Sequence, residues 1–243
     1  MTIQLENIDI MFKTISKISK IYRFEYSNKC YGEFEFITQP IVEPLSLEIK
    51  GFEVLSRIIS SSGDLLNNED FFEKIDNEFL KSIFLSQLIW INRLNDNNYT
   101  FSLNLPISCL LDHEFVKKII EINNVNIAIE INEFSNDCQF NRIRSNIIRL
   151  KKENINFWLD DYNLGNEKVA RWLYLVKWDA LKIDKNYILN ERYSAYLPVI
   201  INYLKIFSDT VIIEGVETNY QYDEYKYKDV LMQGYLFFKN LNY

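Results

Sequence analysis

Short apolar runs in this chain end on a carboxylate or an asparagine, and they alternate with longer segments of helical periodicity. Runs of this kind are typical of buried parallel strands. In chain order they end at Asn104, Glu130, Asp160-Asp161, Asp184 and Glu214. Polar residues at the carboxyl ends of parallel strands meet at one rim of a β/α barrel, where the catalytic sites of that fold lie. The pattern therefore predicts an α/β barrel enzyme.

The chain reads as one domain, because no Ser-, Gly- or Pro-rich linker and no repeat divides it. We expect further strands and helices around the runs described above. The strands are Phe34–Val42, with Pro40 at a bend or an edge, Leu47–Phe52 and Val230–Phe237, and the helical patterns lie within 67–93, 115–122 and 197–206.

The first 22 residues carry apolar side chains at roughly helical spacing, with lysines between them. We therefore expect an irregular amphipathic helix over residues 1–22, followed by the barrel over residues 23–243. Packing against the barrel is the favoured role of this extension, and contact with a partner is the alternative.

The rim would gather more negative charge than a protein can bury unpaired, since most of its polar side chains are carboxylates. Oxygen ligands of this kind suit hard divalent cations. A histidine-rich zinc site is excluded, because the chain has a single histidine, His113. The sequence therefore predicts a site for Mg²⁺-like ions.

The composition limits the classes of partner that this chain is expected to bind. The net charge of −7 argues against a basic surface for a nucleic-acid polymer, although a small phosphate ester can bind where cations supply positive charge. No apolar run is long enough to cross a bilayer, and the N-terminus lacks a signal pattern, so we expect no membrane association. Three scattered cysteines indicate reduced thiols and a cytoplasmic location.

Taken in order, the polar positions form a motif set that is far more specific than any one of them. The set is Glu53-Val54-Leu55-Ser56-Arg57, Asn104, Glu130-Ile131-Asn132-Glu133, Asp160-Asp161, Lys182-Ile183-Asp184, Glu214-Gly215-Val216-Glu217-Thr218 and Gln233-Gly234, with Gln39-Pro40-Ile41 in the opening strand. It resembles the EAL-domain family of cyclic-di-GMP phosphodiesterases, with valine in the middle of the signature tripeptide. The resemblance covers about residue 34 to the C-terminus.

The resemblance implies a single modified (β/α)8 TIM-type barrel that hydrolyses cyclic-di-GMP to the linear dinucleotide pGpG with two Mg²⁺ or Mn²⁺ ions. The metal ligands it implies are Glu53, Asn104, Glu130, Asp160, Asp161 and Glu214. Two neighbouring ions can stabilise both the attacking and the leaving oxygen of a displacement at phosphorus.

The resemblance also implies roles for residues around the metals. Lys182 would orient water or stabilise phosphate charge, and Glu214 would be the general base. Glu217 and Gln233 would position the site, and Glu133 would support the loop after Asp161. The implied substrate-binding residues are Gln39, Leu55, Arg57 and Asp184. For three of these residues a purely structural role is the alternative. Asp184 would then only orient Lys182, Glu217 would lie behind the metal ligands, and Gln39 would make no contact with a ligand.

One loop departs from the family pattern. Where the family usually has Phe-Gly, a small residue and another Gly, this chain has Tyr162-Asn163-Leu164-Gly165-Asn166, with one extra residue before Lys182. Asn163 is a candidate for the left-handed backbone conformation that glycine supplies. This loop couples metal binding to dimerisation in the family, which implies a homodimer. Its change favours the competing hypothesis, a degenerate domain that binds cyclic-di-GMP or a protein partner without turnover.

Overall fold

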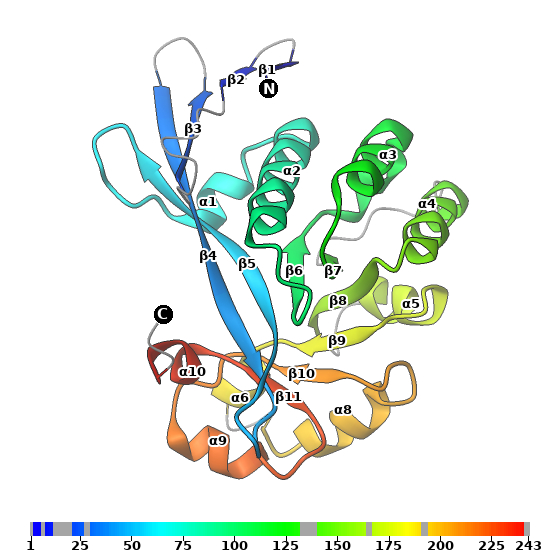
Figure 1. The fold of residues 1–243 in the computed structure, drawn as a ribbon. Coiled ribbons are helices and arrows are strands. Elements are labelled where there is room, and N and C mark those ends of the chain that lie inside the picture. The colour runs from blue at the N-terminus through cyan, green and yellow to red at the C-terminus, as the bar shows by residue number, and fades with distance from the viewer. Residues whose placement is uncertain are drawn as a thin grey trace.

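The structure is a computed structural model that describes residues 2–5, 8–11, 21–26, 30–131, 140–163, 167–190 and 194–240. Its centre is a β-sheet whose strands follow one another in chain order and whose ends meet (Figure 1). The barrel strands are β4 (Cys30–Val42), β5 (Ile49–Ser60), β6 (Thr100–Asn104), β7 (Ile127–Ile131), β8 (Asn156–Tyr162), β9 (Ala180–Ile183), β10 (Val211–Ile213) and β11 (Leu231–Gln233).

The barrel closes where β11 pairs with β4. From β5 to β11 each strand runs parallel to the next, whereas β4 is antiparallel to both of its barrel neighbours. The TIM-type fold predicted from the sequence is confirmed, with one reversed strand as its modification. Since β5 to β11 share one direction, their carboxyl ends form a single rim.

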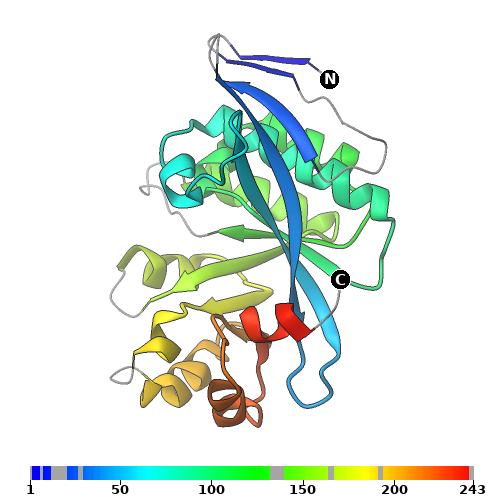
Figure 2. The ribbon, with the colours of Figure 1, turned by 90° about the vertical axis from the view of Figure 1, so that its left-hand side faces the viewer.

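Helices follow most of the strands and cover the outside of the barrel (Figures 1 and 2). They are α1 (Asn68–Phe72), α2 (Asn77–Leu94), α3 (His113–Ile122), α4 (Phe140–Lys152), α5 (Glu167–Leu175), α6 (Asn186–Leu189), α8 (Leu197–Leu204), α9 (Asn219–Tyr225) and α10 (Tyr235–Asn240), with a 3-10 turn at Ile107–Leu111. Polar side chains cap the N-termini of several of these helices: Asp76 caps α2, Asp112 caps α3, and Thr218 forms a capping box with Gln221 in α9.

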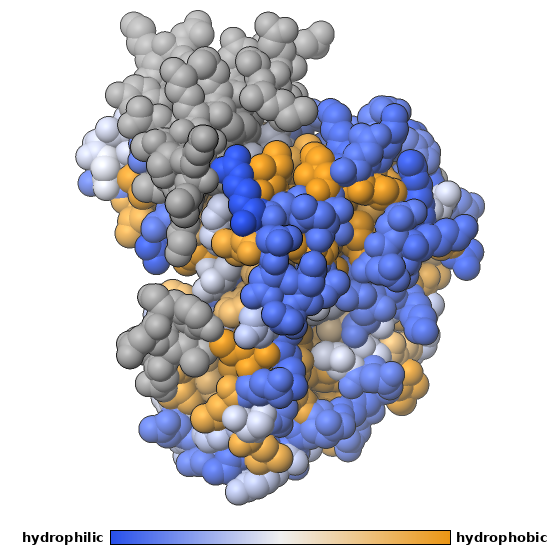
Figure 3. All heavy atoms as spheres, viewed as in Figure 1, coloured by the Kyte–Doolittle hydropathy of each residue, from blue (hydrophilic) through white to orange (hydrophobic). Residues whose placement is uncertain are grey.

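The core lies between the barrel strands and these helices. Strand β7 is buried along its whole length, as expected for a parallel strand covered on both faces. On the outside, α3 and α4 present largely hydrophilic surfaces (Figure 3), in keeping with helices that bury one side. Within the described ranges, no helix is long and apolar enough to span a membrane.

Strands β4 and β5 continue past the barrel as a long twisted ribbon that reaches toward the N-terminal segment (Figures 1 and 2). Strand β3 (Ile21–Tyr26) adds to this ribbon by pairing with β4. The prediction of a helix over residues 1–22 is wrong for the residues described there, because Thr2–Leu5 and Ile8–Met11 form the paired strands β1 and β2. Polar and apolar side chains alternate in Thr2–Leu5, which suits a strand. Residues 12–20 lie outside the described residues.

Two strand predictions need new bounds. The strand expected at Leu47–Phe52 begins at Ile49, after a turn in which Leu47 has a φ of 56°, and it runs on to Ser60. The strand expected at Val230–Phe237 ends at Gln233. Gly234 follows directly, and only glycine fits there, since a Cβ would lie 2.2 Å from the Val216 carbonyl oxygen. Pro40 pairs with β5 alone, between the stretches of β4 that pair with β3 and β11, and it precedes a register shift between Ile41 and Val42, in agreement with the predicted bend or edge.

Candidate active site

The barrel brings most of the predicted ligands together at the carboxyl ends of its parallel strands. The side chains and their positions are Glu53 in β5, Asn104 at the end of β6, Glu130 in β7, Asp160 and Asp161 in β8, Lys182 in β9, Glu214 after β10 and Gln233 in β11. The parallel register explains the grouping: Asn104 pairs with Glu130 across β6 and β7, and Trp158 next pairs with Glu130 across β7 and β8. Residues far apart in the chain thus share one rim.

Lys182 lies at the centre of a carboxylate cluster and is fully buried. Its Nζ atom is 2.7 Å from Glu214 Oε1, 2.9 Å from Glu130 Oε2, 3.1 Å from Asp160 Oδ1 and 3.2 Å from Glu53 Oε2. One ammonium group thus faces four carboxyl groups. If all were ionised, these five groups would carry a net charge of −3, which is the condition that favours binding of further cations.

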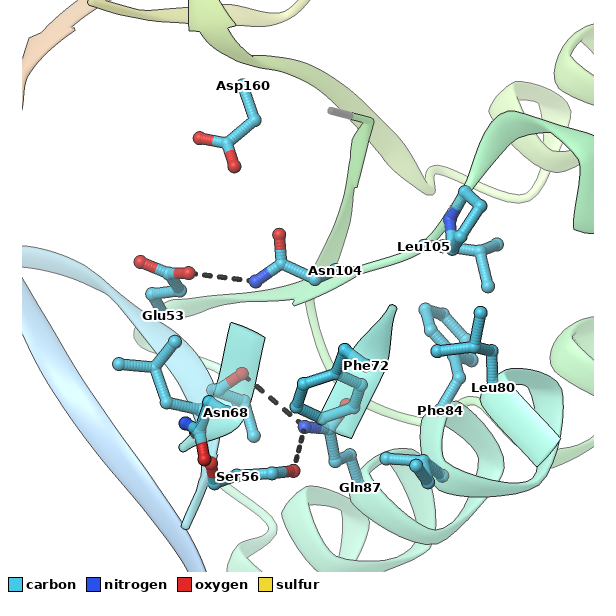
Figure 4. Close-up of a pocket in the computed structure, with 14 residues that line it drawn as sticks. Glu53, Ser56, Asn68, Phe72, Leu80, Phe84, Gln87, Asn104, Leu105 and Asp160 are labelled. Carbon is cyan, nitrogen blue, oxygen red and sulfur yellow. Dashed lines mark hydrogen bonds between the residues drawn. The ribbon is translucent and has the colours of Figure 1, made fainter. Parts of the chain in front are cut away.

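Glu53 is held by amide side chains as well as by Lys182. Asn104 donates from Nδ2 to Glu53 Oε1 at 2.8 Å (Figure 4), and Gln233 donates from Nε2 to Glu53 Oε2. The same Gln233 nitrogen lies 2.8 Å from Gln39 Oε1. Gln39 therefore reaches the site through Gln233, which gives this predicted substrate residue a supporting contact.

The pKa values of the clustered acids are shifted in different directions. Burial raises the pKa of Glu53, but Lys182 and the donated hydrogen bonds of Gln233 and Asn104 outweigh it and leave the pKa lowered. Burial raises the pKa of Glu130 well above its usual value, raises that of Asp160 and brings that of Glu214 to about 8, with Lys182 opposing each shift. For Lys182 itself, burial is overcome by the surrounding carboxylates, and its pKa is raised.

The donor atoms fit divalent cations. Asn104 Oδ1 and Glu130 Oε1 are buried and accept no hydrogen bond from the part of the chain that the structure describes. A buried oxygen without a donor is costly unless something else binds it. Oxygens of Asp160, Asp161 and Glu214 also lie within 4.8 Å of one another. A site made only of carboxylate and carboxamide oxygens suits Mg²⁺ or Mn²⁺.

Asp161, at the edge of this site, has an unusual backbone conformation. Its φ is 50°, in the left-handed region that few non-glycine residues adopt, and aspartate is among the more tolerant ones. Burial, then Asp160 and Asp184, raise its pKa to about 6. Asn163, predicted for this conformation, is not among the described residues with positive φ, so that prediction is wrong. Residues 164–166 of the loop lie outside the described residues.

The remaining predicted residues lie around the cluster. Leu55 and Arg57 follow Glu53 on the same side of β5, where Arg57 donates from Nη1 to Glu35 Oε2 at 2.9 Å. Asp184 follows β9 and accepts a hydrogen bond from the Asn186 N–H. Glu217 is exposed beside the start of α9, and Glu133 lies outside the described residues. The roles of these residues stay predictions.

A cavity of about 370 Å³ opens from the cluster toward α1 and α2 (Figure 4). It reaches Glu53, Asn104 and Asp160 at one end, and its walls are largely apolar. The lining residues beyond the cluster are Val54, Leu55, Ser56, Asn68, Phe72, Leu80, Ile83, Phe84, Gln87, Leu105 and Pro106. Motif reasoning missed Asn68 and Gln87. The available signal was a glutamine on the apolar side of a predicted helix.

Comparison with known proteins agrees with this geometry. The model of the family described as EAL domain matches residues 27–240. The chain belongs to the EAL domain family. The family resemblance predicted from the ordered motifs is thereby confirmed.

Individual EAL proteins resemble the chain at modest identity. The probable cyclic di-GMP phosphodiesterase PdeB of Escherichia coli K12 is 25% identical over 222 residues, which cover 84% of this chain and 42% of PdeB. The chain therefore spans less than half the length of this curated relative.

Solved EAL structures share the fold. An EAL domain protein of Listeria monocytogenes has a TM-score of 0.68 at 22% identity, over 84% of this chain and 87% of that one. Klebsiella pneumoniae BlrP1, solved with cyclic-di-GMP and manganese, has a TM-score of 0.65 at 20% identity, over 84% and 55% of the two chains. BlrP1 has also been solved with cyclic-di-GMP and calcium.

Proposed function

We propose that this EAL domain is a cyclic-di-GMP phosphodiesterase that hydrolyses its substrate to pGpG. The observation that carries the proposal is the cluster at the barrel rim, in which Lys182, Glu53, Glu130, Asp160 and Glu214 come together in a buried, oxygen-rich site. Binding alone does not require this set. A lysine, several acids and unpaired oxygens together are what phosphodiester hydrolysis needs.

The residues that would hold two divalent cations are the predicted ligands: Glu53, Asn104, Glu130, Asp160, Asp161 and Glu214. When bound, Mg²⁺ or Mn²⁺ ions supply positive charge for the phosphate and make water more acidic. The positive charge would also offset the burial and the carboxylate repulsion that raise the pKa of Asp160 and Glu214.

The chain's own residues would share the chemical work. Lys182 places a buried positive charge beside the reacting phosphate, where it stabilises developing negative charge. Glu214 would take a proton from the attacking water at its carboxylate, which must be ionised to do so. Gln233 holds Glu53 in place, and Gln39 holds Gln233. The proposed substrate contacts are those of Leu55, Arg57 and Asp184, while Glu217 supports the site.

A second proposal is that the domain binds a ligand without hydrolysing it. The altered loop after Asp161, Tyr162-Asn163-Leu164-Gly165-Asn166, favours a degenerate domain that binds cyclic-di-GMP or a protein partner. A homodimer, a cytoplasmic location and the division of the chain after residue 22 stay predictions.

Product analysis decides between the two. Incubation of the purified protein with cyclic-di-GMP and Mn²⁺ or Mg²⁺ is expected to give pGpG, resolved by chromatography. Calorimetry in Ca²⁺, run on the same preparation, measures affinity separately. Binding without product from the wild-type protein would support the degenerate domain and reject the phosphodiesterase.

Turnover should depend on divalent cations, because the site is built from oxygen ligands with buried, unpaired members. We expect hydrolysis to stop in excess EDTA and to return when Mg²⁺ or Mn²⁺ is restored. Thermal melting in EDTA and after cation addition gives a readout without substrate, and the cation should raise the midpoint by binding the folded state. Full activity in EDTA would exclude the metal mechanism.

A further inference from the structure

Strand β5 loses one of its neighbours part-way along its length. It pairs with β6 only from Gly51 to Val54, whereas its pairing with β4 continues to Ser60 and beyond the barrel. Alternate residues of a strand direct their carbonyl groups to the same edge. Ser56 and Ile58 therefore present carbonyls beyond Val54, the last residue of β5 that pairs with β6, and buried carbonyls need donors.

Donors from outside the sheet meet these carbonyls. Asn68, the first residue of α1, donates from Nδ2 to the Ser56 carbonyl at 2.8 Å. Gln87 of α2 places Nε2 3.1 Å from Ser56 Oγ and 3.5 Å from the Val54 carbonyl (Figure 4). The Leu66 N–H donates to the Ile58 carbonyl at 2.9 Å. Together, these groups continue the hydrogen bonding that β6 leaves unfinished.

Of the two amide side chains, Gln87 is the one that is unexpected in this wall, because Asn68 is exposed at the start of α1. Gln87 is 5% exposed and lies among Leu80, Ile83 and Phe84, all of which line the same cavity. A buried carboxamide is tolerated there only because it is hydrogen-bonded, and an apolar side chain would pack without that requirement. The presence of a glutamine at this position therefore indicates a role in holding strand β5.

That backbone carries the residues proposed to bind substrate. Leu55 and Arg57 alternate with Val54 and Ser56, so they point to the opposite face of β5, the face that also carries Glu53. We propose that Asn68 and Gln87 are positioning residues that fix β5 over residues 54–57 and so set the affinity for substrate at Leu55 and Arg57. This inference rests on the proposed function, since those contacts belong to it.

The test uses Asn68→Ala and Gln87→Met, which remove the donors while Met keeps most of the glutamine volume. Asn92→Ala is the matched control, because Asn92 lies on the same helix α2 and donates to the Ile122 carbonyl at 2.7 Å, away from β5. Steady-state kinetics with cyclic-di-GMP and Mn²⁺ are combined with hydrogen–deuterium exchange of the peptide that contains residues 53–58.

We expect each variant to raise KM about tenfold and to leave kcat within about twofold, because positioning for binding is lost and the chemical groups are not. Exchange in the β5 peptide should accelerate, and Asn92→Ala should change neither readout. Unchanged KM, or a fall in kcat alone, would overturn the inference. If the wild-type protein turns nothing over, the proposed function fails, and exchange then decides: equal exchange in variants and wild type overturns the positioning role.

Discussion

Asp160→Ala is expected to abolish hydrolysis while the protein stays folded. Asp160 lies in β8 at the rim, 3.1 Å from Lys182 Nζ, and it is one of the proposed cation ligands. Losing several kcal/mol of transition-state stabilisation corresponds to a fall in kcat/KM of about a thousandfold or more. Steady-state product formation in saturating Mn²⁺ measures the change.

Asp160→Ala and Glu53→Ala should have different effects on the thermal stability of the protein. Burial raises the pKa of Asp160, so its ionised form destabilises the fold at neutral pH, and Asp160→Ala should melt no lower than wild type in EDTA. Lys182 and its amide partners leave the pKa of Glu53 lowered despite burial, so the ionised form stabilises the fold above its unfolded pKa. Glu53→Ala should therefore lose activity and also melt lower, and this deficit should shrink as the pH falls through the lowered pKa.

The matched control is Asp209→Ala. Asp209 is an exposed carboxylate that precedes β10, at the end of the barrel opposite Glu214. We expect native turnover from this variant. Near-native rates from Asp160→Ala, with Asp209→Ala behaving as expected, would show that the assignment of Asp160 is wrong.

Lys182→Met should lower both kcat and the stability of the metal-free protein. The substitution removes the positive charge that lies among four carboxyl groups, three of them buried, and breaking such a buried pairing costs about 3–5 kcal/mol. For a chain of this size that corresponds to a fall of about 10 °C in the melting midpoint. Cation binding should restore much of the loss, since it supplies the missing positive charge.

For the reaction, we expect kcat to fall at least about a hundredfold while affinity in Ca²⁺ largely persists, because Lys182 is assigned to charge that develops in the transition state. Lys205→Met is the control: Lys205 pairs with the exposed Asp229, and surface pairs contribute little to stability. A Lys182→Met protein with native kcat would remove the lysine from the proposed mechanism.

The rim of the barrel followed from the sequence because two local rules suffice. Strands in a parallel sheet point the same way, and a run that ends on a polar residue places that residue at a known end. This logic predicts that Asn104, Glu130, Asp160 and Glu214 lie together, and the ordered motifs add Glu53, Lys182 and Gln233. The predicted family is confirmed by the match to the EAL domain model, and the predicted TIM-type fold by the closed order of the strands.

Tertiary structure decided what local patterns do not encode. The spacing of Lys182 from four carboxyl groups depends on closure of the barrel between β4 and β11. The extension of β5 to Ser60 depends on its β4 partner, and the roles of Asn68 and Gln87 arise because β6 stops at Asn104. The N-terminal strands replaced a predicted helix since short segments take the structure that their neighbours allow. Chain order and strand polarity determined which side chains gather at the rim, whereas the distances, hydrogen bonds and shifted pKa values exist only in the closed barrel.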